Sequence, residues 1–263
     1  MCEDKLTFEE LGRRGFTMYQ IKDGFRFGTD TVLLSWFTAC FIKPGKDIRC
    51  LELGANCGAA TLLLCARREG VCVDAVEIDE TAYNVLVKNI GMNSLSDLVS
   101  AYNADLRDLP YEIRNRQYGL VFMNPPFYRS GTGPSTSADK PGKLKGRFEI
   151  NGGLEDFIRT AGSRLIPSSG IMTMVMTSDR ASEAMYHMEN NGIRPSCLIS
   201  VHPFIDKPSK MVLIAGKKTT STIPLEIMPP LILNEKDEDT GKVRSSERIM
   251  RIYEKEHTDC FIW

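Results

Sequence analysis

The sequence predicts an α/β fold with a seven-stranded, mostly parallel sheet, helices on both faces and an antiparallel edge strand. From about residue 48, short β-type runs alternate with helical stretches, which favours parallel strands joined by crossover helices. Two later β-type runs are joined by a loop containing Pro203 and Pro208, and such a short connection suits an antiparallel pair. A hydrophobic content of 42% in 263 residues is ample for a substantial core.

Predicted helices separate most neighbouring strands. None is expected between the strands at 98–103 and 118–123, or between the last two strands. Gly91 and Gly192 lie where two of the helices are expected to end. The expected strands are residues 48–53, 72–78, 98–103, 118–123, 171–177, 197–201 and 210–215, and the expected helices are residues 59–68, 80–90, 154–165 and 180–190.

The flanks of this α/β domain, which we place at residues 48–217, have a different character. Residues 1–47 hold a hairpin-like run at 16–21, a turn at Asp23-Gly24 and an apolar helix at 31–42, and we expect them to pack on the core. Residues 218–263 form a C-terminal extension with a β-type run at 223–227, two prolines and a short helix at 247–253.

Composition excludes several classes of protein. The net charge of −1 gives no global signal for nucleic acid, and no apolar stretch is long enough to cross a bilayer. The first five residues carry acids where a secretory signal would be basic, so we expect a cytoplasmic protein. Eight cysteines without a Cys-x-x-Cys pair and three scattered histidines predict reduced thiols and no metal site.

A glycine-containing turn follows the first strand of the α/β domain. Gly54 permits a tight bend, and the missing side chain of Gly58 lets the backbone approach a ligand closely. Asn56 stands between them, and asparagine tolerates a left-handed backbone well. In an open parallel sheet ligands collect at this kind of turn, although the short motif alone also fits a plain strand-to-helix connection.

Acidic residues follow the next two strands. Glu77 lies 19 residues after Gly58, close to the spacing at which a carboxylate accepts hydrogen bonds from a ribose, so an adenosine-containing cofactor is favoured. Asp79 is better placed as the N-cap of the following helix. Asp105 fits either a contact with an adenine amino group or a second N-cap.

The tetrapeptide Asn124-Pro125-Pro126-Phe127 ends the fourth strand. The amide oxygen of Asn124 and the carbonyl of Pro125 can both accept hydrogen bonds from one NH2 group, because the prolines make the segment rigid. Phe127 can stack on the planar group that carries this amine. A rigid loop is the alternative, but the order of the cofactor turn, Glu77 and Asp105 favours a methyl transfer to a planar nitrogen.

These motifs resemble the S-adenosylmethionine-dependent class I methyltransferases, whose fold is Rossmann-like. The resemblance covers residues 24 to about 217, and the segment Thr29-Asp30-Thr31-Val32-Leu33-Leu34 is similar to that of the bacterial tRNA(Val) adenine-N6 methyltransferases. The chain departs from the family at Asn56, where glycine is common, and in a longer stretch at 129–147.

The resemblance implies roles for individual residues. It implies that the target amine is held by the catalytic residues Asn124, Pro125, Pro126 and Phe127. This amine belongs to RNA, most simply as adenine N6 of tRNA. It implies S-adenosyl-L-methionine contacts at Thr29, Asp30, Glu52, Gly54, Asn56, Gly58, Glu77, Ile78, Asp105 and Asn124. From the residues that follow Phe127 and the basic stretch after them, we expect substrate contacts at Tyr128, Arg129, Lys140, Lys143, Lys145 and Arg147.

Other functions remain open from the sequence. A release-factor glutamine presents the same planar NH2 group, and guanine-N2 methylation of ribosomal RNA uses similar motifs. A non-catalytic RNA-binding subunit is the alternative of another class. The basic residues between 129 and 147 fit a phosphate-contacting loop, but a solvated flexible loop has the same composition.

Overall fold

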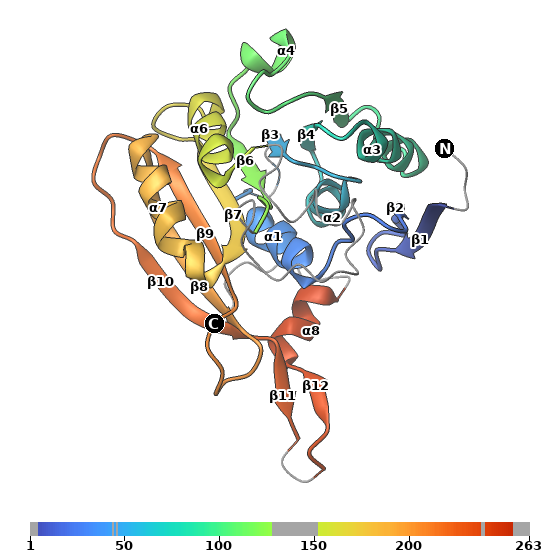
Figure 1. The fold of residues 1–263 in the computed structure, drawn as a ribbon, viewed down its shortest axis with the longest axis vertical. Helices are drawn as coiled ribbons and strands as arrows, with labels where there is room; N and C mark the ends of the chain where they lie inside the picture. The colour runs from blue at the N-terminus through green and yellow to red at the C-terminus, as the bar shows by residue number, and fades with distance from the viewer. Residues whose placement is uncertain (1–4, 44, 46, 128–151, 238–239, 255–263) are drawn as a thin grey trace.

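The computed structural model describes residues 5–43, 45, 47–127, 152–237 and 240–254. Its centre is an eight-stranded sheet in the order β10-β8-β9-β7-β6-β3-β4-β5 (Figure 1). All neighbouring strands pair in parallel except at β9, which runs antiparallel to β7 and to β8. The predicted Rossmann-like, mostly parallel α/β fold is therefore confirmed.

The described elements agree closely with the predicted ones in the α/β domain. The strands are β1 Leu6–Glu10, β2 Thr17–Ile21, β3 Ile48–Leu53, β4 Val71–Glu77, β5 Val99–Asn103, β6 Leu120–Met123, β7 Ile171–Thr177, β8 Ile193–His202, β9 Met211–Lys218, β10 Glu226–Ile232, β11 Asn234–Lys236 and β12 Val243–Ser245. The helices are α1 Thr29–Cys40, α2 Ala59–Arg67, α3 Glu80–Met92, α4 Tyr111–Arg114, α6 Leu154–Arg164, the short 3-10 turn η2 Ser178–Arg180, α7 Ala181–Asn190 and α8 Glu247–Tyr253.

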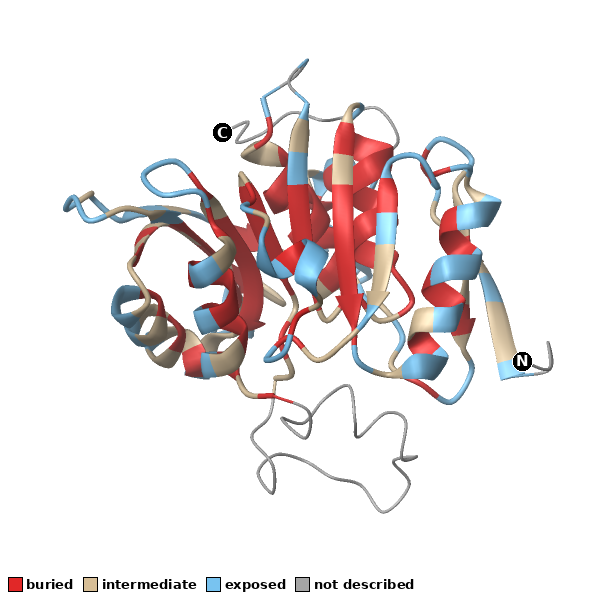
Figure 2. Cartoon of the chain, turned by 90° about the horizontal axis from the view of Figure 1, so that it is seen from above, coloured by how far each residue is buried: buried red, intermediate tan, exposed pale blue. Residues whose placement is uncertain are grey.

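The sheet separates two apolar layers. Strand β6 shows this directly, since Leu120 and Phe122 join the layer formed with α1, α2 and α3, while Val121 and Met123 join the layer formed with α6 and α7. All four side chains are fully buried, as expected for a central parallel strand covered on both faces. Figure 2 shows how the buried residues follow the sheet and the inward faces of the helices.

The sheet differs from the prediction in its number of strands and at its edge. It has eight strands rather than seven, because β10 from the predicted C-terminal extension pairs with β8. The antiparallel strand β9 lies inside the sheet between β7 and β8, so the edges are β10 and β5. Pro229 and Pro230 fall at a register shift in β10, which is where an edge strand tolerates residues without an N–H group.

The N-terminal segment forms the predicted hairpin and helix, with two differences. Strand β2 pairs with β1, a partner that the sequence pattern did not indicate. Helix α1 begins at Thr29 rather than residue 31, with Gly28 as its N-cap. Helix α1 packs on α2 and β7. Its first turn lies near the carboxyl end of β6, because Asp30 is hydrogen-bonded to Asn124, the residue after that strand.

One buried carboxylate links β4 to the start of β3 and to the segment that precedes β6. Asp74 of β4 is fully buried and accepts hydrogen bonds from the Tyr118 hydroxyl at 2.7 Å, from Arg116 at 2.6 Å and from Arg49 at 3.1 Å. A buried charge is tolerated only with such partners. Burial and the hydrogen bond to Asp74 raise the pKa of the Tyr118 phenol above its ordinary value.

Candidate active site

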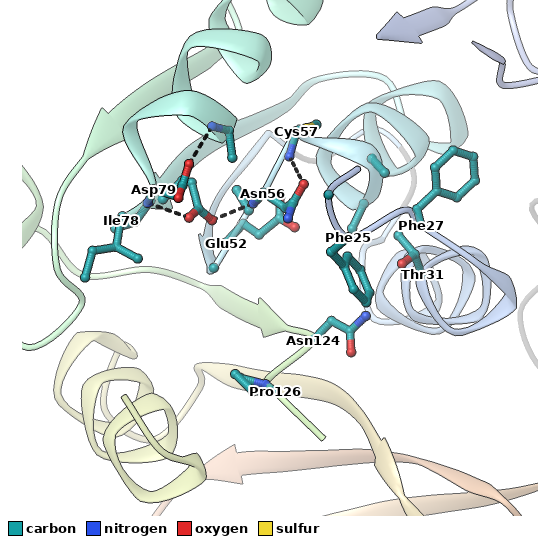
Figure 3. Close-up of a pocket in the computed structure, with 18 of the residues that line it drawn as sticks. Phe25, Phe27, Thr31, Glu52, Asn56, Cys57, Ile78, Asp79, Asn124 and Pro126 are labelled. Atoms are coloured by element: carbon teal, nitrogen blue, oxygen red, sulfur yellow. Dashed lines mark hydrogen bonds between the residues drawn. The ribbon is translucent and has the colours of Figure 1, made fainter. Parts of the chain in front are cut away.

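A cavity of about 530 Å³ opens at the carboxyl ends of β3, β4 and β6. Figure 3 shows Ile78 and Asp79 at one end of this cavity and Phe25 with Asn124 at the other. The predicted residues that line it are Glu52, Gly54, Asn56, Glu77, Ile78, Asn124, Pro125, Pro126 and Phe127. The parallel strands end at one edge of the sheet, which brings together residues from separate parts of the chain.

The turn after β3 has the left-handed backbone that its residues suggested. Gly54, Asn56 and Gly58 have φ values of 72°, 49° and 90°. A Cβ atom on Gly58 would lie 2.5 Å from Cδ1 of the buried Leu86, so this glycine is required for close packing as well as for conformation. Asn56 adopts the left-handed conformation that the sequence analysis attributed to it, and its Oδ1 accepts a hydrogen bond from the Cys57 amide at 2.6 Å.

Glu77 ties this turn to the start of α3. Its two carboxylate oxygens accept hydrogen bonds from the Asn56 amide at 2.7 Å and the Asp79 amide at 2.8 Å. Burial raises the pKa of the Glu77 carboxyl, although both amides favour its charged form. Asp79 is the predicted N-cap, because its Oδ1 accepts from the amides of Thr81 and Ala82.

A second carboxyl group lines the cavity beneath the turn. Glu52 is buried and accepts a hydrogen bond from the Thr61 hydroxyl at the start of α2. Burial raises the pKa of Glu52 from 4.5 to about 8, and the nearby Glu77 carboxylate acts in the same direction. Glu52 is therefore mostly protonated at neutral pH and does not add a full negative charge to the cavity.

Asn124 presents an amide group from the end of β6. Its Nδ2 donates a hydrogen bond to Oδ2 of Asp30 at 2.8 Å, while its Oδ1 is buried without a hydrogen-bond partner. A buried acceptor without a partner is uncommon and indicates a ligand or a functional constraint. Arg180 binds the same segment from the other side, through the carbonyl oxygens of Pro126 and Phe127 at 3.4 Å each.

Four predicted cofactor residues are placed differently. Gly58 shapes the turn without lining the cavity, and Thr29 and Asp30 also lie outside its lining. Asp105, also outside the lining, forms an ion pair with Arg107 at 2.5 Å, and its Oδ1 accepts from the Arg107 amide at 2.8 Å. The sequence left an N-cap open as the alternative for Asp105, but a turn follows this residue and no helix begins there. The guanidinium of Arg107 lowers the pKa of the Asp105 carboxyl.

The predicted substrate residues Tyr128, Arg129, Lys140, Lys143, Lys145 and Arg147 lie outside the described residues. Among the residues that the structure describes, no group of histidine, cysteine and acidic side chains is arranged to hold a metal ion. Within the same residues, no helix has the length and apolar character needed to span a membrane.

The sequence did not indicate that the N-terminal segment forms one wall of the cavity. Met18 and Gln20 of β2, together with Phe25 and Phe27 from the following turn, line the cavity. Gln20 accepts a hydrogen bond from the Phe27 amide at 3.0 Å, which holds this turn against the hairpin. Burial alternates along β2, where Met18 and Gln20 are buried and their neighbours are partly exposed. The residues of this strand do not alternate between apolar and polar, so the sequence did not signal which of them face the cavity.

The fold is similar to that of solved class I methyltransferase structures. An Agrobacterium tumefaciens structure described as a predicted O-methyltransferase is similar with a TM-score of 0.61 and 18% identity, covering 83% of this chain and 94% of that one. The catalytic domain of human Mettl16 in complex with an RNA hairpin is similar with a TM-score of 0.59 and 17% identity, covering 82% and 78% of the two chains.

Sequence relatives narrow the resemblance. Over 161 residues the chain is 32% identical to a Flavobacterium psychrophilum protein named tRNA1(Val) (adenine(37)-N6)-methyltransferase, covering 61% of this chain and 65% of that protein, slightly less than two thirds. A Pectobacterium carotovorum protein of the same name is 26% identical over 220 residues, covering 81% and 84%. No family model matches the chain. The resemblance inferred from the sequence motifs is confirmed by these relatives.

Proposed function

We propose that this protein uses S-adenosyl-L-methionine to methylate an exocyclic nitrogen of RNA, most specifically the N6 atom of an adenine in tRNA. The observation that carries the proposal is the Asn124 amide oxygen, which is buried without a partner beside the cavity. An acceptor at this position suits a ligand NH2 group, because a buried unpaired oxygen is stabilised by a donor. The names of the sequence relatives support the same reaction.

The cavity residues fit the proposed cofactor. A volume of about 530 Å³ is within the range of small-molecule sites, and the left-handed turn at Gly54 and Asn56 leaves backbone close to the ligand space. Glu77 lies at the end of β4, where each carboxylate oxygen keeps lone-pair capacity for a ribose hydroxyl beside its amide partner. When bound, S-adenosyl-L-methionine supplies an electrophilic methyl group.

Asn124 and Pro125 would hold the amine during the reaction. Adenine N6 is a weak nucleophile, because its lone pair is delocalised into the ring. Two hydrogen bonds to acceptors, Asn124 Oδ1 and the Pro125 carbonyl, orient the amine so that the lone pair faces the methyl group, and positioning accounts for most of the acceleration. The nitrogen would gain the methyl group as the sulfur–methyl bond breaks and the sulfur leaves as a neutral thioether, and it would lose one proton during or after transfer.

The target base must leave its stack to reach this cavity. Phe127 lines the cavity beside Pro126, and its ring offers a surface on which a base can stack. We propose tRNA as the partner, with the base received by Phe127 or Tyr128 and the phosphates contacted by the basic residues Arg129, Lys140, Lys143, Lys145 and Arg147. Phosphate contacts of this type predict an affinity for tRNA that falls steeply with salt.

The experiment is methyl transfer by the purified protein to unmodified tRNA and ribosomal RNA, followed by mass spectrometry of the nucleosides. We expect N6-methyladenosine in tRNA. The Asn124→Ala variant should transfer about 10- to 100-fold more slowly, the loss expected for one important hydrogen bond. Its binding of S-adenosyl-L-methionine, measured by calorimetry, should change much less.

Three results would contradict the proposal. The first is transfer only to guanine N2 in ribosomal RNA, and the second is transfer to a release-factor glutamine. The third is cofactor binding without transfer to any of these substrates, as expected of a non-catalytic RNA-binding protein. A near wild-type rate for Asn124→Ala would reject the role of the amide while leaving the reaction itself intact.

A further inference from the structure

Asp30 in the first turn of α1 contacts the side chain of Asn124. The two residues are 94 positions apart, and their side chains meet through the 2.8 Å hydrogen bond from Asn124 Nδ2 to Asp30 Oδ2. Asp30 does not line the cavity, so its side chain acts on the site through Asn124. This placement differs from the direct cofactor contact that the resemblance implied for Asp30.

The chemistry of the two groups allows one amide orientation. An ionised carboxylate only accepts hydrogen bonds, so the side of the amide that faces Asp30 must be the NH2 group. The reverse rotamer would place the amide oxygen against the carboxylate and would lose the hydrogen bond. Oδ1 is therefore directed away from Asp30, where it is buried without a partner.

Neighbouring residues restrict the remaining freedom of this pair. Pro125 confines the backbone of Asn124 to extended conformations, and Pro126 does the same for Pro125. Gly28 leaves space for the carboxylate, because a Cβ atom at that position would lie 3.1 Å from Asp30 Oδ1. The backbone of Asn124 is thus held by the prolines and its side chain by Asp30.

We propose that Asp30 is a positioning residue, which keeps the Asn124 amide oxygen available to accept a hydrogen bond from the target amine. This inference rests on the proposed function, in which Asn124 Oδ1 contacts the substrate. It assigns to the start of α1 a part in the transfer step rather than in holding the cofactor. Without the carboxylate the amide can rotate and present NH2 to the amine, which places two donors against each other.

The test is a double-mutant cycle with Asp30→Ala, Asn124→Ala and the double variant. We expect Asp30→Ala to lower kcat about 10-fold or more, with little change in KM for tRNA or in Kd for S-adenosyl-L-methionine. The same substitution should cost almost nothing further in the Asn124→Ala background. Asp30→Asn should lie between wild type and Asp30→Ala, because an asparagine can pair with Asn124 in either orientation.

Glu80→Ala is the matched control, because Glu80 is an exposed acid in the first turn of α3 and does not line the cavity. It removes a favourable charge from a helix N-terminus and should leave kcat unchanged. Equal losses from Asp30→Ala in the wild-type and Asn124→Ala backgrounds would overturn the proposal and indicate a structural role. Unchanged kcat for Asp30→Ala would also overturn it.

A measurement on the protein alone separates this inference from the proposed function. In a sample labelled with ¹⁵N-asparagine, the side-chain NH2 signals of Asn124 are identified by their loss in Asn124→Ala. We expect these protons to exchange with water at least 10-fold faster in Asp30→Ala, and unchanged exchange would overturn the positioning role. If wild type transfers no methyl group to any RNA, the proposed function fails, while this readout still decides whether Asp30 holds the amide.

Discussion

Replacing Glu52 by glutamine should stabilise the protein, and the gain should grow with pH. The carboxyl group of Glu52 is buried, and its pKa is raised from 4.5 to about 8. Below pH 4.5 the folded and unfolded chains both carry the proton. Between 4.5 and 8 the unfolded chain loses the proton and the folded protein keeps it, so this group makes the wild type less stable as pH rises.

The magnitude follows from the difference in pKa. At pH 7 the 2.5 pH units above 4.5 correspond to a loss of about 3 kcal/mol in the free energy of unfolding, at about 1.4 kcal/mol per unit. Glutamine has the same shape, does not titrate and can still accept a hydrogen bond from Thr61. Glu52→Gln should therefore match wild type near pH 4.5 and exceed its stability by up to about 3 kcal/mol at pH 7.

The assay is urea unfolding of the two ligand-free proteins, followed by circular dichroism at pH 5, 6, 7 and 8. Glu112→Gln, at an exposed position on α4, is the control and should show no growing difference from wild type. A difference between Glu52→Gln and wild type that stays constant from pH 5 to 8 would refute the reasoning. It would show that Glu52 is charged in the folded protein despite its burial.

Two further substitutions test the packing around the site. Gly58→Ala should destabilise the protein by about 2–4 kcal/mol in urea unfolding, because it combines a left-handed backbone with a contact to Leu86. Gly91→Ala is the control and should not destabilise the protein, because the space around its Cβ position is open. Equal effects of the two substitutions would contradict this prediction. Tyr118→Phe should cost about 2 kcal/mol, because it removes a hydrogen bond to the buried charge of Asp74, and an unchanged urea midpoint would show that this bond is dispensable.

Local sequence patterns were sufficient to predict most helices and strands of the α/β domain. The strand at Ile48–Leu53 and the strand at Ile171–Thr177 have the predicted bounds, because apolar runs between turn-forming residues have few alternative structures. The left-handed Asn56 and the N-cap Asp79 were predictable for a similar reason. In each case the decisive interactions are made within a few residues of the chain.

The differences between the predicted and the observed sheet come from strand pairing between residues that are distant in the sequence. The β-type run that we expected at 223–227, within a C-terminal extension, lies at Glu226–Ile232 and pairs with β8. Its two prolines are tolerated because β10 is an edge strand. Whether a strand lies at an edge depends on distant partners. The same reason explains the interior position of β9, since a hairpin connection does not state on which side of β8 the returning strand will pair.

The sequence by itself determined the class of fold, the glycine turn, the acid at the end of β4 and the amide at the end of β6. Each of these depends on residue type and on its position relative to one strand. The tertiary structure alone decided that the N-terminal hairpin forms a wall of the cavity and that Asp30 binds Asn124. The physical reason is that a hydrogen bond across 94 residues leaves no periodic trace in the chain, while the packing of α1 on the sheet brings both side chains to one edge.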